Sequence, residues 1–483
     1  MAENIIEIRI DSFSYDNQPQ LKDIKLDIKR GEFIVLTGLS GCGKTTLLRS
    51  INGLVPDFYE GKLEGYVKVL GRDIKDYQKG ELAKYMGNVF QNPKDQFFST
   101  IAEDEVALVG ENLGMERQEL KKRVKEVMEK LDILDLKDKS VFEMSGGERQ
   151  KVAIASTLVY DTDIVLFDEP SASLDYFSTL DLKETMKKLK DMGKTIIVAE
   201  HRLFYLRDIC DKMIIMKDCS IGKILEQSEL DDEVRIENNL RCFDEKDLYP
   251  ERDINESEKT VDIRNLDIKI GNRILLKNLN VGLQKGECMG IIGTNGVGKT
   301  TMAKQLCGLL DAKNALISYG KSKKKRIRNC YYVFQDADSQ LFSHTVENEL
   351  IPKNKLSDKE YLKMVKDYLI AGNLWEKRTD HPQEMSSGEK QRLALLTSLV
   401  EDKKLIILDE PTSGLDFKRM ESVAGLIKEK SEEVPIIIIT HDTELLFKAC
   451  NTVLMITNDS YKKVNVKDNK DEILSFFENP IIN

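Results

Sequence analysis

Two glycine-rich segments of the chain have the composition and spacing of phosphate-binding loops. GLSGCGKTT occupies residues 38–46, and GTNGVGKTT occupies residues 293–301. Each fits the pattern G-x-x-x-x-G-K-[ST] after an apolar run, so its glycines allow backbone N–H groups to close around phosphate oxygens where a helix begins. Lys44 and Lys299 add a positive charge for the β and γ phosphates. The sequence therefore predicts two sites for a nucleoside triphosphate.

Two adjacent carboxylates follow a later apolar run in each half, within IVLFDEPSASLD and LIILDEPTSGLD. At the end of a parallel strand, Asp168 and Asp409 would face the phosphate loop, where they can hold the water shell of a metal ion. Glu169 and Glu410 are the candidate general bases, which would orient and polarise the attacking water. These residues predict metal-assisted hydrolysis of a triphosphate.

The phosphate loops belong to a longer internal repeat. They lie 255 residues apart, and the same order recurs downstream in VFQNPKDQFFS and VFQDADSQLFS, then in EMSGGERQK and EMSSGEKQR. Repetition in one order indicates two related domains. We place the first at residues 1–225 and the second at 260–483. The charged stretch 226–259 is typical of a solvated linker.

The elements that position these residues are expected to be strands and helices in alternation. Short, β-branched apolar runs such as residues 435–440 suit strands buried on both faces of a parallel sheet. They alternate with amphipathic helical patterns such as residues 115–134. This alternation indicates βα units and an α/β fold with a mostly parallel sheet in each half.

Composition excludes several other classes of protein. The net charge of −10 disfavours a nucleic-acid binder that works by broad electrostatic attraction. The sequence contains no apolar run of about 20 residues that could cross a membrane and no signal-peptide pattern, so we expect a cytosolic chain. Its eight cysteines form no C-x-x-C pair, which indicates reduced thiols rather than a zinc site.

The segment SGGERQ at residues 145–150 resembles the signature of the ATP-binding cassette (ABC) ATPases, and the resemblance extends over both halves. It implies two tandem phosphate-loop domains, each with an antiparallel β region and a helical subdomain beside its parallel core sheet. It also implies an intramolecular pseudo-dimer, in which the signature of one half closes over MgATP held by the other. The expected signature residues are Ser145, Gly146, Gly147, Glu148, Ser386, Ser387, Gly388 and Glu389.

Further site residues follow from the same resemblance. His201 and His441 resemble histidines that sense the γ-phosphate, and Asp175 and Asp416 belong to loops that link the two sites. Tyr15 looks like the aromatic residue that stacks on adenine, with a plain strand aromatic as the alternative. The expected metal ligands are Thr45, Gln91, Asp168, Thr300, Gln335 and Asp409. The remaining residues expected to contact ATP are Gly38, Ser40, Gly41, Cys42, Gly43, Lys44, Thr46, Gly293, Asn295, Gly296, Val297, Gly298, Lys299 and Thr301.

The halves are expected to be active but unequal. Ile270 takes the place of Tyr15 in the second half, and Ser387 that of Gly146. The second half also has a shortened β region at residues 312–329. Its KSKKKRIR run indicates a solvated turn, with contact to lipid headgroups or a partner as the alternative. Cys42 lies where a helix N-terminus could lower its thiol pKa and favour alkylation, with an inert residue as the alternative.

The string QNPKDQ at residues 91–96 is similar to that of the ATPases of energy-coupling factor (ECF) transporters. This resemblance implies ATP hydrolysis that powers import of a vitamin or a transition-metal ion. The implied partners are a transmembrane coupling protein and a small substrate-binding membrane protein. The chain would then lie peripherally on the cytoplasmic face of the cell membrane, held there by these partners.

Two other functions remain as alternatives. One is the fused ATPase of a sugar importer, which the QNPKDQ string and the near-complete second site disfavour. The other is a ribosome-associated factor with two cassettes, whose halves are usually joined by a long basic linker, whereas the linker here is acidic. Transport predicts fractionation with membranes, and a ribosome factor predicts salt-sensitive cosedimentation with ribosomes.

Overall fold

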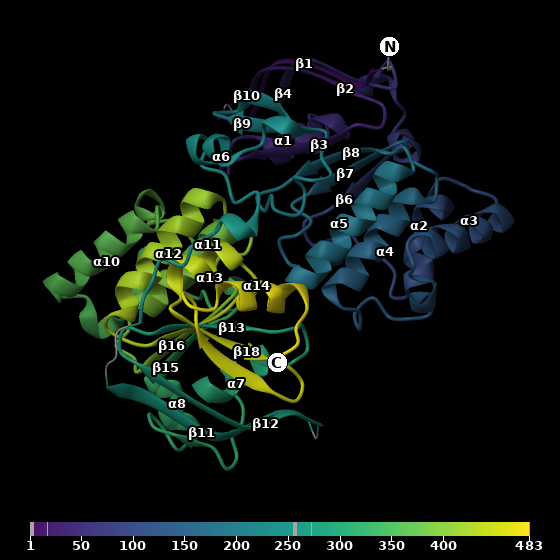
Figure 1. The fold of residues 1–483 in the computed structure, drawn as a ribbon. Helices are drawn as coiled ribbons and strands as arrows, with labels where there is room; N and C mark the ends of the chain where they lie inside the picture. The colour runs from purple at the N-terminus through teal and green to yellow at the C-terminus, as the bar shows by residue number, and fades with distance from the viewer. Residues whose placement is uncertain (1–3, 17, 255–257, 272, 483) are drawn as a thin grey trace. The chain divides into compact units, whose positions relative to one another are not determined.

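The computed structural model describes residues 4–16, 18–254, 258–271 and 273–482. It divides the chain into two compact units, Met1–Phe243 and Asp244–Asn483, which we call unit 1 and unit 2 (Figure 1). Each unit has an α/β fold, as the sequence predicts. Among the described residues, no helix combines the length and apolar character needed to cross a membrane.

Unit 1 is built on a six-stranded sheet in the order β10-β9-β3-β8-β7-β6, parallel except for the edge strand β10. Alternate residues of β3 enter different core clusters, Phe33 and Val35 on one side and Ile34 and Leu36 on the other. This burial on both faces explains the unbroken apolar runs. The strands are β3 (Phe33–Gly38), β6 (Met86–Val89), β7 (Ile164–Asp168), β8 (Thr195–Ala199), β9 (Lys212–Lys217) and β10 (Ser220–Glu226).

A second sheet in unit 1 is antiparallel and has the order β2-β1-β4-β5. Its strands are β1 (Asn4–Tyr15), β2 (Gln18–Lys29), β4 (Lys62–Val69) and β5 (Arg72–Asp73). The helices of unit 1 are α1 (Lys44–Ile51), α2 (Ala102–Asn112), α3 (Arg117–Lys130), α4 (Gly146–Leu158), α5 (Tyr176–Asp191) and α6 (Asp232–Glu237). Helices α2 and α3 follow Gln91 and correspond to the expected helical subdomain.

Unit 2 repeats this plan, with the core order β15-β16-β17-β13-β18-β19. These strands are β13 (Cys288–Ile292), β15 (Cys330–Val333), β16 (Leu405–Asp409), β17 (Ile436–Ile439), β18 (Thr452–Ile456) and β19 (Tyr461–Asn465). The antiparallel sheet contains β12 (Arg273–Gln284), β11 (Lys259–Ile270) and β14 (Leu316–Ile317). The two residues of β14 confirm the expected shortening of this region.

The helices of unit 2 include one that the sequence analysis did not expect. The KSKKKRIR run, interpreted as a turn, forms most of α8 because Ser322 caps the N-terminus of that helix. The helices are α7 (Lys299–Cys307), α8 (Lys323–Asn329), α9 (Val346–Leu350), α10 (Lys359–Ala371), α11 (Ser387–Leu399), α12 (Phe417–Ser431), α13 (Thr443–Ala449) and α14 (Lys470–Glu478).

The segment 226–259 differs from the solvated linker that its charge suggests. Leu240 and Phe243 are buried in a core cluster of unit 1. Arg252 is buried in unit 2, where its guanidinium donates to Ser431 Oγ at 2.7 Å and to Glu432 Oε1 at 2.8 Å. These few buried residues anchor the described part of the segment. Its composition does not reveal them, because most of its charged side chains are exposed. The division between Phe243 and Asp244 falls within it.

Candidate functional site

The phosphate loop of each unit connects a buried strand to a helix. In unit 1 it joins β3 to α1, and in unit 2 it joins β13 to α7. Gly43 has φ +101°, and a Cβ there would lie 2.6 Å from the carbonyl oxygen of Gln20. A Cβ on Gly38 would lie 2.3 Å from the carbonyl oxygen of Met216. These two positions therefore require glycine for conformation and space, independently of any ligand.

The lysine of each loop is a buried cation that contacts backbone carbonyls. Lys44 is 5% exposed, and its Nζ donates to Gly38 O at 3.1 Å and to Leu39 O at 3.2 Å. Lys299 is 7% exposed, with its Nζ 2.7 Å from Gly293 O. Carbonyl oxygens compensate a buried ammonium ion less completely than an anion does. The loops are thus electrostatically suited to a phosphate group.

A hydroxyl and a carboxylate lie together beside each loop. Thr45 Oγ1 donates to Asp168 Oδ1 at 3.0 Å, and Thr300 Oγ1 donates to Asp409 Oδ2 at 3.1 Å. Burial raises the pKa of Asp168 to about 6, and the charge of Glu169 contributes to this rise. Burial also raises the pKa of the Asp409 carboxyl. A divalent cation at either position would favour the charged carboxylate.

These oxygen donors suit a magnesium ion that is bound jointly with a nucleotide. The described residues contain no cluster of three or more His, Cys, Asp or Glu side chains that could hold a metal ion. Magnesium, however, is usually bound by one or two protein oxygens together with substrate phosphates and water. The hydroxyl–carboxylate pair of each unit fits that mode of binding.

Tyr332 distinguishes the carboxylate of unit 2 from that of unit 1. Its buried hydroxyl donates to Asp409 Oδ2 at 2.7 Å. In unit 1 the matching position is Asn88, whose side-chain oxygen instead accepts from Asn52 Nδ2 at 2.9 Å. Nothing in the sequence indicates this contact, because a tyrosine inside a buried strand looks like an ordinary core residue.

Tyr332→Phe is therefore expected to destabilise unit 2 by about 2 kcal/mol, the usual contribution of a hydrogen bond to a charged group. The free energy of unfolding, followed by denaturant titration, measures this loss. Tyr331→Phe is the matched control, because its hydroxyl forms a hydrogen bond with the neutral Thr397 Oγ1 at 3.1 Å, which should contribute about 1 kcal/mol. Equal losses in the two variants would contradict a special role for the Tyr332 contact.

Glu169 and Glu410 share an unusual backbone conformation. Their φ angles are +44° and +49°, in the left-handed region that residues other than glycine seldom adopt. Their N–H groups donate to the carbonyl oxygens of Ala199 and Ile439, each at 2.8 Å. Such strained residues concentrate at functional sites. The strained conformation therefore supports the prediction that both glutamates are catalytic. The sequence contains no direct signal for this conformation.

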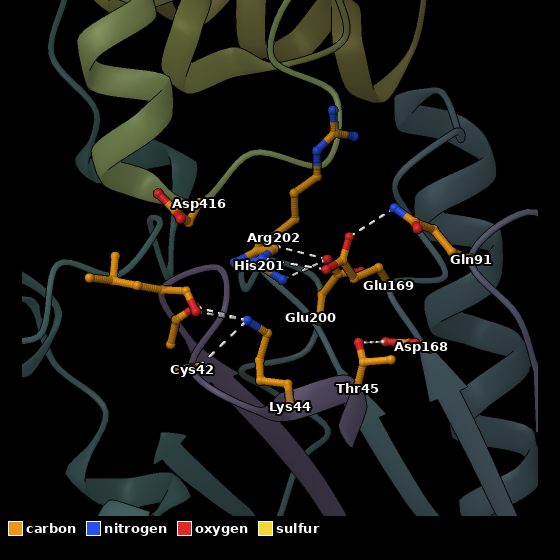
Figure 2. Close-up of polar contacts among 12 residues, drawn as sticks. Cys42, Lys44, Thr45, Gln91, Asp168, Glu169, Glu200, His201, Arg202 and Asp416 are labelled. Atoms are coloured by element: carbon orange, nitrogen blue, oxygen red, sulfur yellow. Dashed lines mark hydrogen bonds and ion pairs between the residues drawn. The ribbon is translucent and has the colours of Figure 1, made fainter. Parts of the chain in front are cut away.

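In unit 1, the side chains expected around the γ-phosphate converge on Glu169 (Figure 2). Gln91 Nε2 donates to Glu169 Oε2 at 2.9 Å, and His201 Nε2 lies 3.5 Å from Glu169 Oε1. In unit 2, Glu410 accepts from the backbone N–H of His441 at 3.0 Å and from Thr440 Oγ1 at 3.2 Å. Each unit therefore brings its histidine to its glutamate, but through different atoms.

A buried carboxylate fixes the histidine segment of unit 1. Glu200 is 2% exposed and accepts from the backbone N–H groups of His201 at 2.7 Å and Arg202 at 3.1 Å. It also accepts from the Tyr205 hydroxyl at 2.8 Å and from the Ser171 N–H at 3.2 Å. Glu200 thus ties the histidine to the segment after Glu169.

The signature residues form the N-terminus of a helix in each unit. Ser145 Oγ accepts from the Glu148 N–H at 3.2 Å, and Glu148 Oε2 accepts from the Ser145 N–H at 2.6 Å, which makes a capping box for α4. Ser386 and Glu389 form the equivalent capping box for α11. The side chain of Ser387 lies outside the described residues. The N-termini of these helices have the geometry and dipole that favour an anion.

Other predicted residues have local structural roles of their own. Asp175 caps α5 by accepting from the Ser178 N–H at 2.7 Å, and Asp416 caps α12 by accepting from the Arg419 N–H at 2.9 Å. Tyr15 is half-buried at the end of β1, with its ring 4.7 Å from that of Phe13 in an edge-to-face contact. Ile270 is 53% exposed at the equivalent end of β11. A role in linking sites or stacking on adenine stays a prediction for these residues.

Of the two alternatives for Cys42, a thiol with a lowered pKa and an inert residue, the structure favours the inert residue. The thiol is only 6% exposed, and burial raises its pKa although the charge of Lys44 acts in the opposite direction. Desolvation of the thiolate therefore outweighs the favourable electrostatics of the helix N-terminus.

We accordingly expect N-ethylmaleimide to modify Cys42 far more slowly than Cys219, the half-exposed thiol of the chain, whether ATP is present or not. Peptide mass mapping after timed labelling measures both rates in one sample. Rapid labelling of Cys42 that ATP prevents would contradict this expectation and restore the reactive-thiol hypothesis.

Comparison with known proteins agrees with this geometry. The family model described as ABC transporter matches residues 21–172 and 276–413, one match in each unit. A protein of Treponema denticola named as an ABC transporter ATP-binding protein is 37% identical, covering 97% of this chain and 99% of that protein. A Bacillus subtilis protein named as the HMP/thiamine import ATP-binding protein YkoD is 30% identical, covering 92% of this chain and 87% of that protein.

Among solved structures, a model of ribosome-bound archaeal Pelota and ABCE1 has a TM-score of 0.72 at 22% identity, covering 97% of this chain and 80% of that one. That likeness concerns the fold alone. The two family matches and the relative aligned along nearly the whole sequence show that this chain belongs to the ABC transporter family, as an ATPase with two ATP-binding domains.

Proposed function

We propose that this chain is the ATPase of an ECF-type importer and powers uptake of a vitamin or a transition-metal ion through separate membrane subunits. These subunits are a transmembrane coupling protein and a small substrate-binding membrane protein. The observation that carries the proposal is an exposed phenylalanine at the same place in each unit. Phe98 is 83% exposed and Phe342 is 82% exposed.

The loop before each phenylalanine is closed by the last glutamine of the QNPKDQ string or its counterpart. Gln96 Oε1 accepts from the Phe90 N–H at 3.2 Å, and Gln340 Oε1 accepts from the Phe334 N–H at 2.7 Å. In unit 1, Asn92 also caps the short turn Pro93–Asp95 inside the loop. The string thus has a structural role, since it folds the loop that joins Gln91 to the exposed ring.

A buried carboxylate fixes the loop on the other side of the ring. Glu105 is 3% exposed, and its Oε2 accepts from the N–H groups of Phe98 at 2.9 Å and Ser99 at 2.7 Å. Glu349 accepts in the same way from the Ser343 N–H in unit 2. Large aromatic side chains held on rigid supports are typical anchors of protein interfaces. We therefore propose that both rings insert into the coupling protein.

The relatives support import but leave the cargo open. The name of YkoD refers to HMP and thiamine import, which is a property of that protein. Because cargo specificity in this architecture belongs to the membrane subunits, this chain can serve a different micronutrient. A sugar importer and a ribosome-associated factor remain the alternatives, and the experiment below separates them.

The hydrolytic step uses residues already located in each unit. A water molecule attacks the γ-phosphorus of ATP, and the bond to the bridging oxygen of ADP breaks. Glu169 or Glu410 orients the water and accepts its proton, while Lys44 or Lys299 neutralises charge on the β and γ phosphates. Magnesium, held at Thr45 and Asp168 or at Thr300 and Asp409, would supply charge neutralisation when bound.

Purification of the tagged chain from its native membranes in mild detergent tests the proposal. We expect mass spectrometry to find a polytopic coupling protein and a small multispanning protein in stoichiometric amounts. In the double variant Phe98→Ala/Phe342→Ala, recovery of both should fall on the order of tenfold or more, as for the loss of aromatic anchors. Phe58→Ala is the matched control, because Phe58 is 72% exposed but lies outside the loop.

Three results would contradict the proposal. Ribosomal proteins without membrane partners would indicate the ribosome-associated factor. A separate soluble sugar-binding protein, recovered together with two large membrane subunits, would indicate the sugar importer. Equal recovery of the membrane partners with the double variant and with the Phe58→Ala control would show that the exposed rings are not part of the interface.

A further inference from the structure

A strongly basic stretch in unit 2 is not used by the catalytic machinery. Residues 309–328 contain seven lysines and arginines but only one acidic residue, Asp311, in a chain whose net charge is −10. The fold engages two of these cations. Lys323 forms an ion pair with Asp311 at 3.1 Å, and Arg326 is buried, with its guanidinium donating to the carbonyl oxygen of Leu310 at 3.3 Å.

Close packing holds α8 against the end of α7. A Cβ on Gly308 would lie 2.6 Å from the carbonyl oxygen of Lys323 and 3.2 Å from a side-chain carbon of Ile327. The hydroxyl of Tyr319 donates to the carbonyl oxygen of Leu306 at 2.9 Å, which fastens the intervening segment to α7. The short helix is therefore part of a rigid surface, although its seven residues would be unstable alone.

The other five cations of this stretch are exposed, and the same stretch has exposed aliphatic side chains. Lys321, Lys324 and Lys325 are exposed, and nowhere in the described parts of the chain does a carboxylate lie within ion-pairing distance of them. Ile327 is 52% exposed, Leu309 47% and Leu310 40%. We call these six side chains the α8 face.

We propose that the α8 face binds anionic lipid headgroups directly at a membrane surface. Lysines beside aliphatic side chains are the combination that partitions into the headgroup region, since the charges meet lipid phosphates while the apolar groups enter the boundary below. This contact is additional to the attachment through membrane subunits proposed above, and it does not depend on the identity of those subunits.

The chemistry of the α8 face favours lipid over nucleic acid. Nucleic-acid surfaces usually add aromatic rings that stack on bases, whereas the apolar members of this face are all aliphatic. Unit 1 offers an internal contrast. Its equivalent segment, between β4 and β6, contains four lysines and arginines together with Asp73, Asp76 and Glu81, so its charges nearly balance, whereas those of the α8 segment do not.

Vesicle cosedimentation of the purified full chain tests the proposal. We expect binding to vesicles of phosphatidylcholine mixed with phosphatidylglycerol, little binding to phosphatidylcholine alone, and release as salt is raised. The triple variant Lys321→Gln/Lys324→Gln/Lys325→Gln should weaken the partition coefficient by about fivefold per lysine, on the order of 100-fold in all. The variant Ile327→Ser should lower the binding that persists at high salt.

The matched control removes the same charge elsewhere in unit 2, through Lys359→Gln/Lys363→Gln/Lys418→Gln. These lysines are exposed, and this triple variant should bind anionic vesicles as the native chain does. Basal ATP hydrolysis should be unchanged in both triple variants, which shows that they fold. Failure of the native chain to bind anionic vesicles, equal binding by the two triple variants, or tighter binding to RNA than to vesicles through the same lysines would overturn the proposal.

Discussion

The double variant Glu169→Gln/Glu410→Gln is expected to lower the rate of ATP hydrolysis by about 10²- to 10⁴-fold, the usual contribution of a general base. The change keeps the shape of each side chain but removes the group that accepts the proton from water. Both glutamates occupy the same left-handed backbone position at the end of a core strand. Release of inorganic phosphate by the purified chain measures the effect.

The single variants should differ from each other. Glu169 contacts Gln91 and His201 through their side chains, whereas Glu410 accepts from the backbone of His441 and from Thr440. We expect the larger loss for Glu169→Gln, because side chains from two other segments position its carboxylate. Glu184→Gln and Glu429→Gln, at exposed helical positions, should leave the rate unchanged. Equal losses in the two single variants would contradict unequal sites.

Lys44→Ala and Lys299→Ala are each expected to weaken ATP binding at one site by about 10- to 100-fold. A charge-assisted hydrogen bond to phosphate contributes roughly 1.5 to 3 kcal/mol, and each lysine is already desolvated beside its loop. Equilibrium binding of ATP to the chain that also carries the Glu169→Gln/Glu410→Gln changes measures affinity without turnover.

The unaltered site in each lysine variant serves as the internal control. The native stoichiometry should be two ATP per chain, with one tight site remaining after either substitution. If Lys44→Ala abolished binding at both sites, or if neither variant changed the stoichiometry, the assignment of one phosphate loop to each site would be contradicted.

The core of the fold and the phosphate loops could be predicted because their residues are constrained locally. Continuous β-branched runs such as Ile436–Ile439 can be buried only as central strands, and the loop glycines are required by backbone geometry. The order of these elements along the chain then indicated the α/β fold, which the structure confirms.

Contacts between distant segments could not be predicted from the sequence. The Tyr332 hydroxyl donates to Asp409 across neighbouring strands, and Glu200 accepts from the distant Ser171 as well as from its own segment. Neither residue differs in type from an ordinary core or turn residue. Arg252 is buried within a stretch whose composition suggests solvation, because burial depends on which few side chains meet a folded surface.

Opposing effects at one residue also limited prediction. At Cys42 the sequence shows the lysine and the helix start that would lower the thiol pKa, but it does not show the burial that raises it. Only the structure decides which effect is larger. The KSKKKRIR run shows the same dependence on packing. The sequence predicts a solvated turn, but the segment packs closely against Gly308 and forms the helix α8.

The most direct test of the central claim is the rate of ATP hydrolysis by this chain in the complex extracted from its native membranes, compared with the chain alone. Coupling to a transporter predicts that the membrane subunits change the rate severalfold and that Glu169→Gln/Glu410→Gln lowers hydrolysis by about 100-fold or more without dispersing the complex. An identical rate with and without membrane proteins, or a double variant that hydrolyses ATP at close to the native rate, would contradict an ATPase that drives transport through these residues.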